Sequence, residues 1–401
     1  MKISVCGKTV ETYSLPCVEY LVYESDSDVI NISICDEFEV KSIRPLKLNL
    51  SAANDFSVNT GSKVIIEFEN HNPLFIFTYK KQCVNKDEFT YFFDEGEFTL
   101  DEIKLKSGEK LYVGAKAVLH AHISAQDAEN IEVCGPGVID ITGISTKKRR
   151  MAKFLSCKNV TVKDTTFVGA IDWTIVPINC DNVTIDGANI ITWEVNGDGI
   201  DPVGSKNVYI KNCFLHCADD CISVKATDYD HQEGCTDCDN IQVSGCIMWN
   251  TKPGNAMEIG FETRCDNITN VSFVDCDVLH CVYEGWQSGG VFTIHNGDRA
   301  VVSNVLYKNI RVENAEQKLF DFKVYKSHYS KDEERGFIKN IVAEDIYYFG
   351  EELPPSILRG CDNQHGVKNM VIRGLYHNDK RLDNVLKARF IAESGSELTF
   401  E

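Results

Sequence analysis

Asn182-Val183-Thr184-Ile185-Asp186-Gly187 is one of nine copies of a short phrase that recurs between residues 130 and 374. Each copy begins with Asn, continues with alternating apolar and polar residues, and often ends in Gly, Asp or Asn. The other copies begin at Asn130, Asn159, Asn207, Asn240, Asn270, Asn304, Asn340 and Asn369. Alternation with a period of two is typical of a half-buried strand, so each copy predicts one strand.

The spacing of the copies predicts the fold class. Successive copies are 23 to 36 residues apart, which is too irregular for helical repeats but suits coils whose loops differ in length. We therefore expect an all-β chain, a right-handed parallel β-helix that forms a single-stranded solenoid of about nine coils. The handedness follows from the general chirality of parallel crossovers.

The asparagine that opens each phrase has a structural explanation. Its short amide tolerates the left-handed backbone conformation at a turn, and equivalent amides in neighbouring coils can form a hydrogen-bond ladder. We expect the nine asparagines to be structural.

Residues 1–97 lack the phrase. Alternating apolar runs at 18–24, 29–34, 63–69 and 73–79 are separated by Asp, Asn, Ser and Gly clusters, which predicts an antiparallel, β-sandwich-like N-terminal domain. Residues 98–401 then form the β-helix catalytic domain, and residues 95–123 form first turns that cap the open end of its core.

Charge and hydropathy exclude several classes of partner. The formal net charge is −19, and no basic stripe is present that would favour nucleic acid or an anionic membrane. No window approaches 18 apolar residues, so no membrane span is expected. The N-terminus has no apolar segment typical of a signal peptide, which favours a cytoplasmic location.

The chain has 17 cysteines, an odd and scattered set. Many, such as Cys213, Cys246 and Cys276, occupy apolar positions of the repeat, which predicts buried thiols and a reducing compartment. The obvious CxxC pair, Cys235 and Cys238, has no second pair to complete a zinc site. We expect neither a metal nor another cofactor.

Two acidic motifs lie about one coil apart: residues 196–201, with the sequence NGDGID, and residues 218–224, with the sequence ADDCISV. Asp198 and Asp219 are 21 residues apart, so the solenoid places them on adjacent rungs, about 4.8 Å apart along its axis. With Asp220, three carboxylates converge. Their repulsion costs stability, so such a cluster indicates catalysis or cation binding, unless the aspartates merely cap turns. Glycoside hydrolysis needs this set, one protonated acid and one ionised carboxylate that activates water.

The two motifs resemble the NTD and GDD motifs of the polygalacturonase family, glycoside hydrolase family 28, and of the related dextranase and isopullulanase family 49. The resemblance covers about residues 98–376, and family 49 also has a β-sandwich before its solenoid. It implies that Asp219 is the general acid and that Asp198 and Asp220 hold and deprotonate the attacking water. It also implies inversion of configuration, with carboxyl groups about 6.5 to 9.5 Å apart.

Two departures from the polygalacturonase pattern concern the substrate. The Gly-His-Gly motif is replaced by Gly254-Asn255-Ala256, so the family's histidine is absent. The Arg-x-Lys motif is replaced by Thr293-Ile294-His295, in which neither Thr293 nor His295 is a fixed cation. With the acidic net charge, this favours a neutral α-linked oligo- or polysaccharide over pectin.

Further side chains are candidates for substrate binding. Glu258 is an acid in an otherwise apolar strand, Lys225 follows the Asp pair, and His295 is either a ligand or a structural histidine. Trp173, Trp193, Trp249 and Tyr283 could stack on a sugar or simply pack. The predicted substrate-binding set is Asn196, Asp201, Lys225, Asn255, Glu258, Glu262, Trp286 and His295.

Two other functions stay open. A β-helix polysaccharide lyase or epimerase would use a basic residue and often calcium, and a non-catalytic carbohydrate-binding solenoid would need none of the acids. The long coils that begin at Asn207, Asn270 and Asn304 have room for loops that block one end of the cleft, which predicts exo action. The sugar, the linkage and the oligomeric state are left open.

Overall fold

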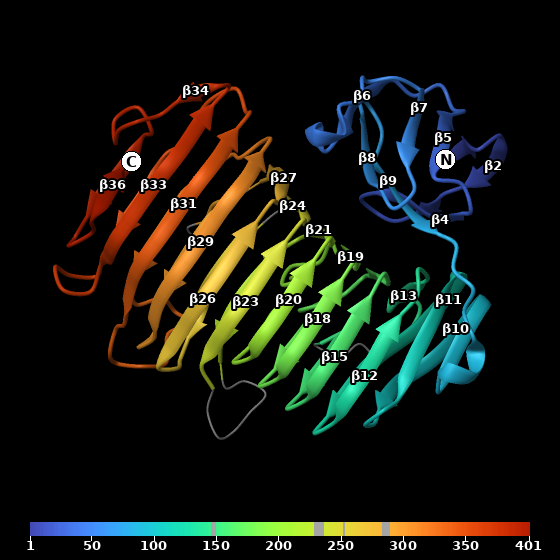
Figure 1. The fold of residues 1–401 in the computed structure, drawn as a ribbon, viewed down its shortest axis with the longest axis horizontal. Coiled ribbons are helices and arrows are strands. Elements are labelled where there is room, and N and C mark those ends of the chain that lie inside the picture. Colours follow the sequence, from blue (N-terminus) through green and yellow to red (C-terminus); the bar gives the residue numbers. More distant parts are fainter. Residues whose placement is uncertain (146–149, 228–235, 252, 283–288) are drawn as a thin grey trace.

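The computed structural model describes residues 1–145, 150–227, 236–251, 253–282 and 289–401. A small N-terminal sandwich lies beside a long solenoid of parallel strands (Figure 1). Two short 3₁₀ helices, Leu46–Leu48 and Lys86–Glu88, are the helical elements of these ranges. Within them, no helix has the length and apolar character of a membrane span.

The solenoid is a parallel β-helix, and the predicted fold class is confirmed. Its first turns are β10 (Tyr91–Leu105) and β11 (Lys110–Gln126), which pair in parallel. Later strands pair in parallel with the equivalent strand of the next coil. The expected division of the chain after residue 97 falls within β10, and the domain boundary stays a prediction.

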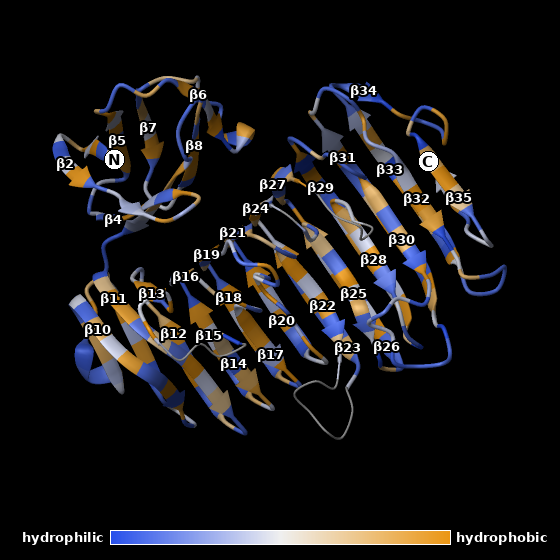
Figure 2. Ribbon diagram, turned by 180° about the vertical axis from the view of Figure 1, so that it is seen from behind, coloured by the Kyte–Doolittle hydropathy of each residue, from blue (hydrophilic) through white to orange (hydrophobic). Residues whose placement is uncertain are grey.

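Three faces run along the solenoid, and we name each by its content. The asparagine face consists of β12 (Glu129–Cys134), β15 (Lys158–Lys163), β18 (Asp181–Asp186), β20 (Lys206–Lys211), β23 (Cys238–Ser244), β26 (Asn267–Val274), β29 (Val301–Val312), β31 (Phe337–Tyr348) and β33 (Val367–His377). The docking face consists of β13 (Val138–Asp140), β16 (Thr166–Val168), β19 (Asn189–Ile191), β21 (Phe214–Cys217), β24 (Ile247–Asn250) and β27 (Asp277–Cys281). The carboxylate face consists of β14 (Ala152–Leu155), β17 (Ile175–Ile178), β22 (Ile222–Ala226), β25 (Met257–Thr263), β28 (Phe292–Asn296), β30 (Phe320–Val324), β32 (Ser356–Arg359) and β35 (Phe390–Glu393), which run side by side in Figure 2. The short strands β34 (Lys380–Arg381) and β36 (Leu398–Phe400) close the C-terminal end.

The asparagine ladder is confirmed. The nine phrase asparagines adopt the left-handed conformation, with φ between 54 and 60°. Asn182 Nδ2 donates to Asn159 Oδ1 at 2.8 Å, and the same bond joins Asn240 to Asn207. Two rungs use an aspartate instead, since Asn207 donates to Asp181 and Asn270 to Asp239.

The alternation of the phrase also predicts the core. Val160, Val183 and Val208 follow their asparagines and stack inside the solenoid. Cys213, Cys246 and Cys276 are fully buried free thiols, as their positions predict. Cys235 of the CxxC pair lies outside the described residues.

The N-terminal sandwich has two sheets. One consists of β2 (Lys8–Glu11), β1 (Lys2–Val5), β5 (Val29–Ile34) and β7 (Asp55–Asn59), and the other of β3 (Tyr13–Ser14), β4 (Glu19–Ser25), β9 (Leu74–Lys80), β8 (Lys63–Phe68) and β6 (Val40–Arg44). The pairs are antiparallel except β4 with β9, which differs from the expected pattern. The chain crosses to the other sheet between these two strands, and such a crossover allows a parallel return.

The sandwich packs on the docking face. Phe75 and Phe77 of β9 form an apolar cluster with Phe214 and Ile247 of the solenoid, and the rings of Phe75 and Phe214 are 4.8 Å apart. Lys63 reaches the carbonyl oxygen of Gly187 at 2.7 Å. The sandwich therefore covers one face, while the carboxylate face carries the candidate site.

Candidate active site

Three aspartates lie at the start of neighbouring rungs of the carboxylate face. Asp198 precedes Ile200, which bridges β17 to β22, while Asp219 and Asp220 come just before β22. The structure thus brings together the three side chains that the sequence spacing predicts. Their nearest carboxylate oxygens lie within 4.8 Å of one another. The expected separation of about 6.5 to 9.5 Å refers to whole carboxyl groups and is a different distance, so inversion stays a prediction from the family resemblance.

Burial and mutual repulsion disfavour a full set of negative charges. Asp198 and Asp220 are buried, and Asp219 is partly exposed. Burial raises the pKa of all three carboxyls. Nearby acids add to the rise, as Asp219 does for the pKa of Asp220, while Lys225 opposes it. The cluster therefore retains protons at a pH at which exposed aspartates are ionised.

Lys225 is the buried cation of the cluster. Its Nζ lies 2.7 Å from Asp198 Oδ2 and 3.0 Å from Asp201 Oδ1. Burial raises the pKa of Asp201 to about 6, although Lys225 opposes the shift. Lys225 and Asp201 thus belong to the cluster, as part of its charge balance.

The ring of Trp173 packs against Lys225. Lys225 Nζ lies 3.9 Å from the centre of the Trp173 ring, and Arg150 lies 3.8 Å from it. Arg150 is in turn bound to Asp172 Oδ1 at 2.6 Å. Two cations thus lie against its ring, which favours the packing role for Trp173. Neither Arg150 nor Asp172 belongs to a sequence motif that predicts this contact.

The other candidate aromatic side chains are placed differently. Trp249 packs against His216, His280 and Phe75, in the contact with the sandwich, and Trp193 is half-buried beside the same apolar cluster. Trp286 and Tyr283 lie outside the described residues.

The segment that replaces the family's Gly-His-Gly motif holds Asp220. The backbone N–H and the Nδ2 of Asn255 both donate to Asp220 Oδ1 at 2.8 Å, and Asn255 Oδ1 accepts from the N–H of Gly290. Gly254 has a φ of +91°, and a Cβ there would overlap the backbone of Asp219. Glycine is therefore needed at this contact.

Glu258 and His295 are fully buried, and the structure brings them together below the surface of the face. His295 Nδ1 lies 2.9 Å from Glu258 Oε2, and His295 Nε2 lies 3.2 Å from Asp321 Oδ2. Sequence reasoning missed Asp321. The signal was available, because the polar residues of Phe320–Val324 alternate with apolar ones as they do around Glu258.

The two remaining candidates lie beside Asp219. Glu262 is nearly buried on β25, and its charge contributes to the raised pKa of Asp219 after burial, the largest cause. Asn196 is exposed, and its backbone N–H is a hydrogen-bond donor that opposes the rise.

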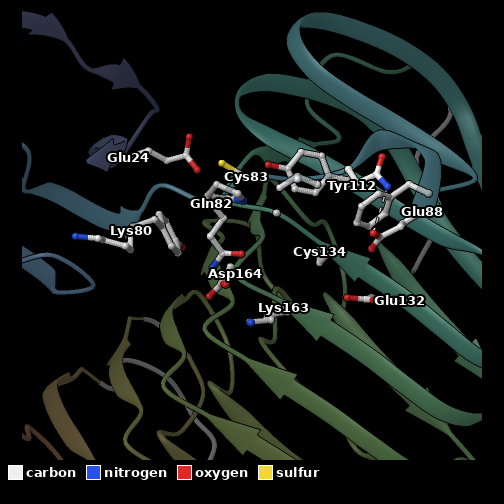
Figure 3. A pocket seen from close by; sticks show the side chains of 16 residues that line it. Glu24, Lys80, Gln82, Cys83, Glu88, Tyr112, Glu132, Cys134, Lys163 and Asp164 are labelled. Atoms are coloured by element: carbon white, nitrogen blue, oxygen red, sulfur yellow. Dashed lines mark hydrogen bonds between the residues drawn. The ribbon is translucent and has the colours of Figure 1, made fainter. Parts of the chain in front are cut away.

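Two other groupings lie apart from the aspartates. A cavity of about 270 Å³ lies where the sandwich meets the first coils, and Glu24, Glu132 and Asp164 line it with Lys80 and Lys163 (Figure 3).

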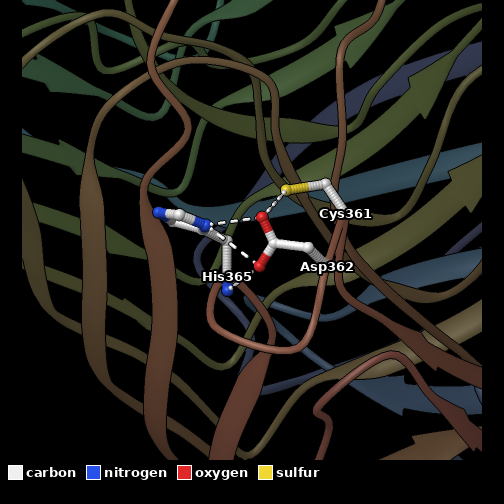
Figure 4. A group of neighbouring side chains, drawn as sticks. All are labelled: Cys361, Asp362 and His365. Carbon is white, nitrogen blue, oxygen red and sulfur yellow. Dashed lines mark hydrogen bonds and ion pairs between the residues drawn. The ribbon is translucent and has the colours of Figure 1, made fainter.

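Cys361, Asp362 and His365 form the other grouping, in an exposed turn (Figure 4). Asp362 accepts from His365 Nδ1 and from the backbone N–H groups of Gln364 and His365. These hydrogen bonds account for the arrangement of the turn.

Sequence comparison identifies relatives of this chain. Residues 91–374 match the family model of the glycosyl hydrolases family 28. A polygalacturonase of Juniperus ashei is 30% identical over 161 residues, which are 40% of this chain and 29% of that protein. An endo-polygalacturonase of Pectobacterium carotovorum subsp. carotovorum is 25% identical over 229 residues, 51% of this chain and 53% of that protein. The chain thus matches about half or less of the length of these relatives.

Solved structures with the same fold include enzymes of both families that the motifs resemble. Dex49A from Penicillium minioluteum aligns with a TM-score of 0.60 and 13% identity, over 96% of this chain and 83% of that one. The polygalacturonase from Erwinia carotovora ssp. carotovora aligns with a TM-score of 0.50 and 17% identity, over 76% of this chain and 85% of that one. At these identities the likeness concerns the fold.

Proposed function

The chain belongs to the glycosyl hydrolases family 28, and from this premise we propose that it hydrolyses α-linked glycosidic bonds with Asp219, Asp198 and Asp220. The observation that carries the proposal is the cluster of these carboxyls, within 4.8 Å of one another and with raised pKa values. Such a cluster supplies both a proton donor and a proton acceptor at one place.

The proposed reaction transfers one proton from the protein to the glycosidic oxygen and one proton from water to the protein. Asp219, the most exposed of the three, donates its proton to the glycosidic oxygen as the bond to the anomeric carbon breaks. A water molecule attacks that carbon from the other face and passes its proton to an ionised carboxylate, Asp198 or Asp220. Lys225 favours the ionised form of Asp198 through its 2.7 Å contact. Attack from the opposite face inverts the configuration.

A neutral sugar is the proposed substrate class. At the positions of the family's cations, Thr293 is uncharged, and His295 is fully buried and faces Glu258 and Asp321. Arg299 binds Asp266 and Asp332. The buried cations near the aspartates also face carboxylates of the chain, as Lys225 faces Asp198 and Arg150 faces Asp172. A uronate carboxylate would have to compete with these groups.

The test is a substrate screen with a matched pair of variants. Release of reducing ends is measured on dextran, pullulan, polygalacturonate and small α-linked oligosaccharides. Asp219→Asn keeps the shape of the side chain but removes the proton, so we expect turnover to fall by a factor of roughly 10² to 10⁴. Asp383→Asn, at an exposed Asp–Lys pair, is the control and should keep the wild-type rate.

Wild-type rate in Asp219→Asn would contradict the assignment of the acid. Faster hydrolysis of polygalacturonate than of any neutral glycan would contradict the substrate class and leave the three aspartates in place.

A further inference from the structure

Three fully buried ionisable side chains form a row on the carboxylate face: Glu258 of β25, His295 of β28 and Asp321 of β30. A carboxylate faces each ring nitrogen of His295, at 2.9 Å and 3.2 Å. Both nitrogens can donate only in the imidazolium form. Burial lowers the pKa of His295, but Glu258 and Asp321 outweigh it and raise the pKa to about 9.

The row continues into two lysines. Lys323 Nζ lies 2.9 Å from Asp321 Oδ1, and Lys318 Nζ lies 3.2 Å from Asp321 Oδ2. The signs of charge therefore alternate from Glu258 through His295 and Asp321 to the lysines. Alternation lowers the cost of burying these groups, since an unpaired buried ion is strongly destabilising.

The side chains and backbone around the row are closely packed. The ring of Phe261 stacks on that of His295, with centres 4.5 Å apart. Gly260 has a φ of +123°, and a Cβ there would overlap the carbonyl oxygen of His295. Only glycine permits this approach of β25 to β28.

The row meets the three-aspartate cluster at Asp220. Glu258 follows Asn255 in the same segment, and Asn255 donates two hydrogen bonds to Asp220. The charge of Glu258 also contributes to the raised pKa of Asp220, after burial and Asp219. Asp220 thus has donors that favour its ionised form and a buried like charge that opposes it.

We infer that Glu258, His295 and Asp321 are positioning residues that set the pH at which Asp220 can accept a proton, a role that rests on the function proposed above. The charged groups that face Asp220 are Asp219, Lys225 and Glu258, and Asp198 belongs to the same cluster. Glu258 faces His295, and the buried hydroxyl of Tyr307 on β29 is within its electrostatic reach. The row acts through Asp220 and does not touch the substrate.

The test is the pH profile of kcat/KM for Glu258→Gln, on the best substrate of the screen. The variant removes a like charge and keeps an acceptor for His295, so the acidic limb should move to lower pH by about one unit, the size of a nearby charge effect. Glu393→Gln is the matched control, because Glu393 lies on the same face, in an exposed pair with Arg359. An unchanged acidic limb in Glu258→Gln, or an equal shift in the control, would overturn the inference.

A second measurement needs neither turnover nor a stable Glu258 variant. In the wild-type protein, the ring protons of His295, assigned by their loss in His295→Gln, should report an imidazolium up to about pH 9. Titration of the His295 ring near pH 6.5 would contradict the alternation of charges in the row and overturn the inference. If no glycan is hydrolysed at all, the proposed function fails, while ¹³C titration of the Asp220 carboxyl in wild type and Glu258→Gln still tests the coupling.

Discussion

Replacement of Lys225 by methionine should destabilise the protein in a pH-dependent manner. The ammonium group lies 2.7 Å from Asp198 and 3.0 Å from Asp201, and all three side chains are buried. Methionine fills much of the same volume but leaves two buried carboxylates without their cation. Removal of one partner from a buried ion pair costs about 3 to 5 kcal/mol, so we expect this loss in the free energy of unfolding at pH 8.

The sign of the pH dependence follows from the two carboxyls. In the folded variant, burial without Lys225 raises their pKa values further above the unfolded value of about 3.9. Below about pH 4 the two carboxyls are largely protonated in both the folded and the unfolded variant, so the loss of the cation costs little stability. As the pH rises above the unfolded value, the unfolded chain loses these protons while the folded variant keeps them, so the penalty grows until the pH reaches the raised folded pKa values. The pKa of Asp201 is already about 6 in the wild type. The difference between wild type and variant should therefore be small near pH 4 and complete near pH 8.

The assay is urea unfolding of wild type and Lys225→Met at pH 4.5, 6 and 8, followed by circular dichroism. Lys116→Met is the control, because Lys116 lies in an exposed pair with Glu95, and such pairs contribute about 0 to 1 kcal/mol. A loss of stability that is equal at the three pH values, or no larger than that of the control, would refute the proposed role of Lys225.

Four further outcomes are expected. Asn240→Ala should cost about 1 to 2 kcal/mol of unfolding free energy, because alanine is strained at a φ of 58° and removes the bond to Asn207, and Asn240→Gly should recover part of the loss in the same urea assay. Phe75→Ala should cost about 3 to 5 kcal/mol by cavity formation in the contact with Phe214, and a loss below 1 kcal/mol would mean that the sandwich is not firmly packed. EDTA should leave the rate of glycan hydrolysis unchanged, whereas a calcium requirement would favour the lyase or epimerase alternative. Early chromatograms of a polymer digest should show one small sugar, and a ladder of intermediate oligomers would contradict exo action.

The sequence predicted the solenoid because its repeat carries two independent signals. The alternation after each asparagine places residues such as Val183 in the core, and the asparagine itself marks the left-handed turn. Both are local properties of the chain. The same spacing predicted that Asp198, Asp219 and Asp220 converge, since a regular coil converts sequence distance into neighbouring rungs.

The partners of the cluster were less predictable. Arg150 and Asp172 precede Asp198 by a coil or more and reach the site around Trp173, a contact that depends on side-chain direction. Phe261 of β25 and Tyr325, just after β30, pack against the ring of His295. These contacts depend on side-chain direction, which has no periodic signal.

The apolar seam between the sandwich and the solenoid has a mechanical consequence. It joins β9 and its neighbours to successive rungs from Val138 to Leu279, so the sandwich cross-links these coils from one side. In the described part of the chain the apolar seam ends at Leu279, and Arg44 and the backbone N–H of Leu46 extend the contact to Glu313. The coils that follow lie beyond this seam. Under a pulling force on the C-terminus, the last coils should therefore unfold one by one. The coils that contact the sandwich should then unfold together, at a higher force.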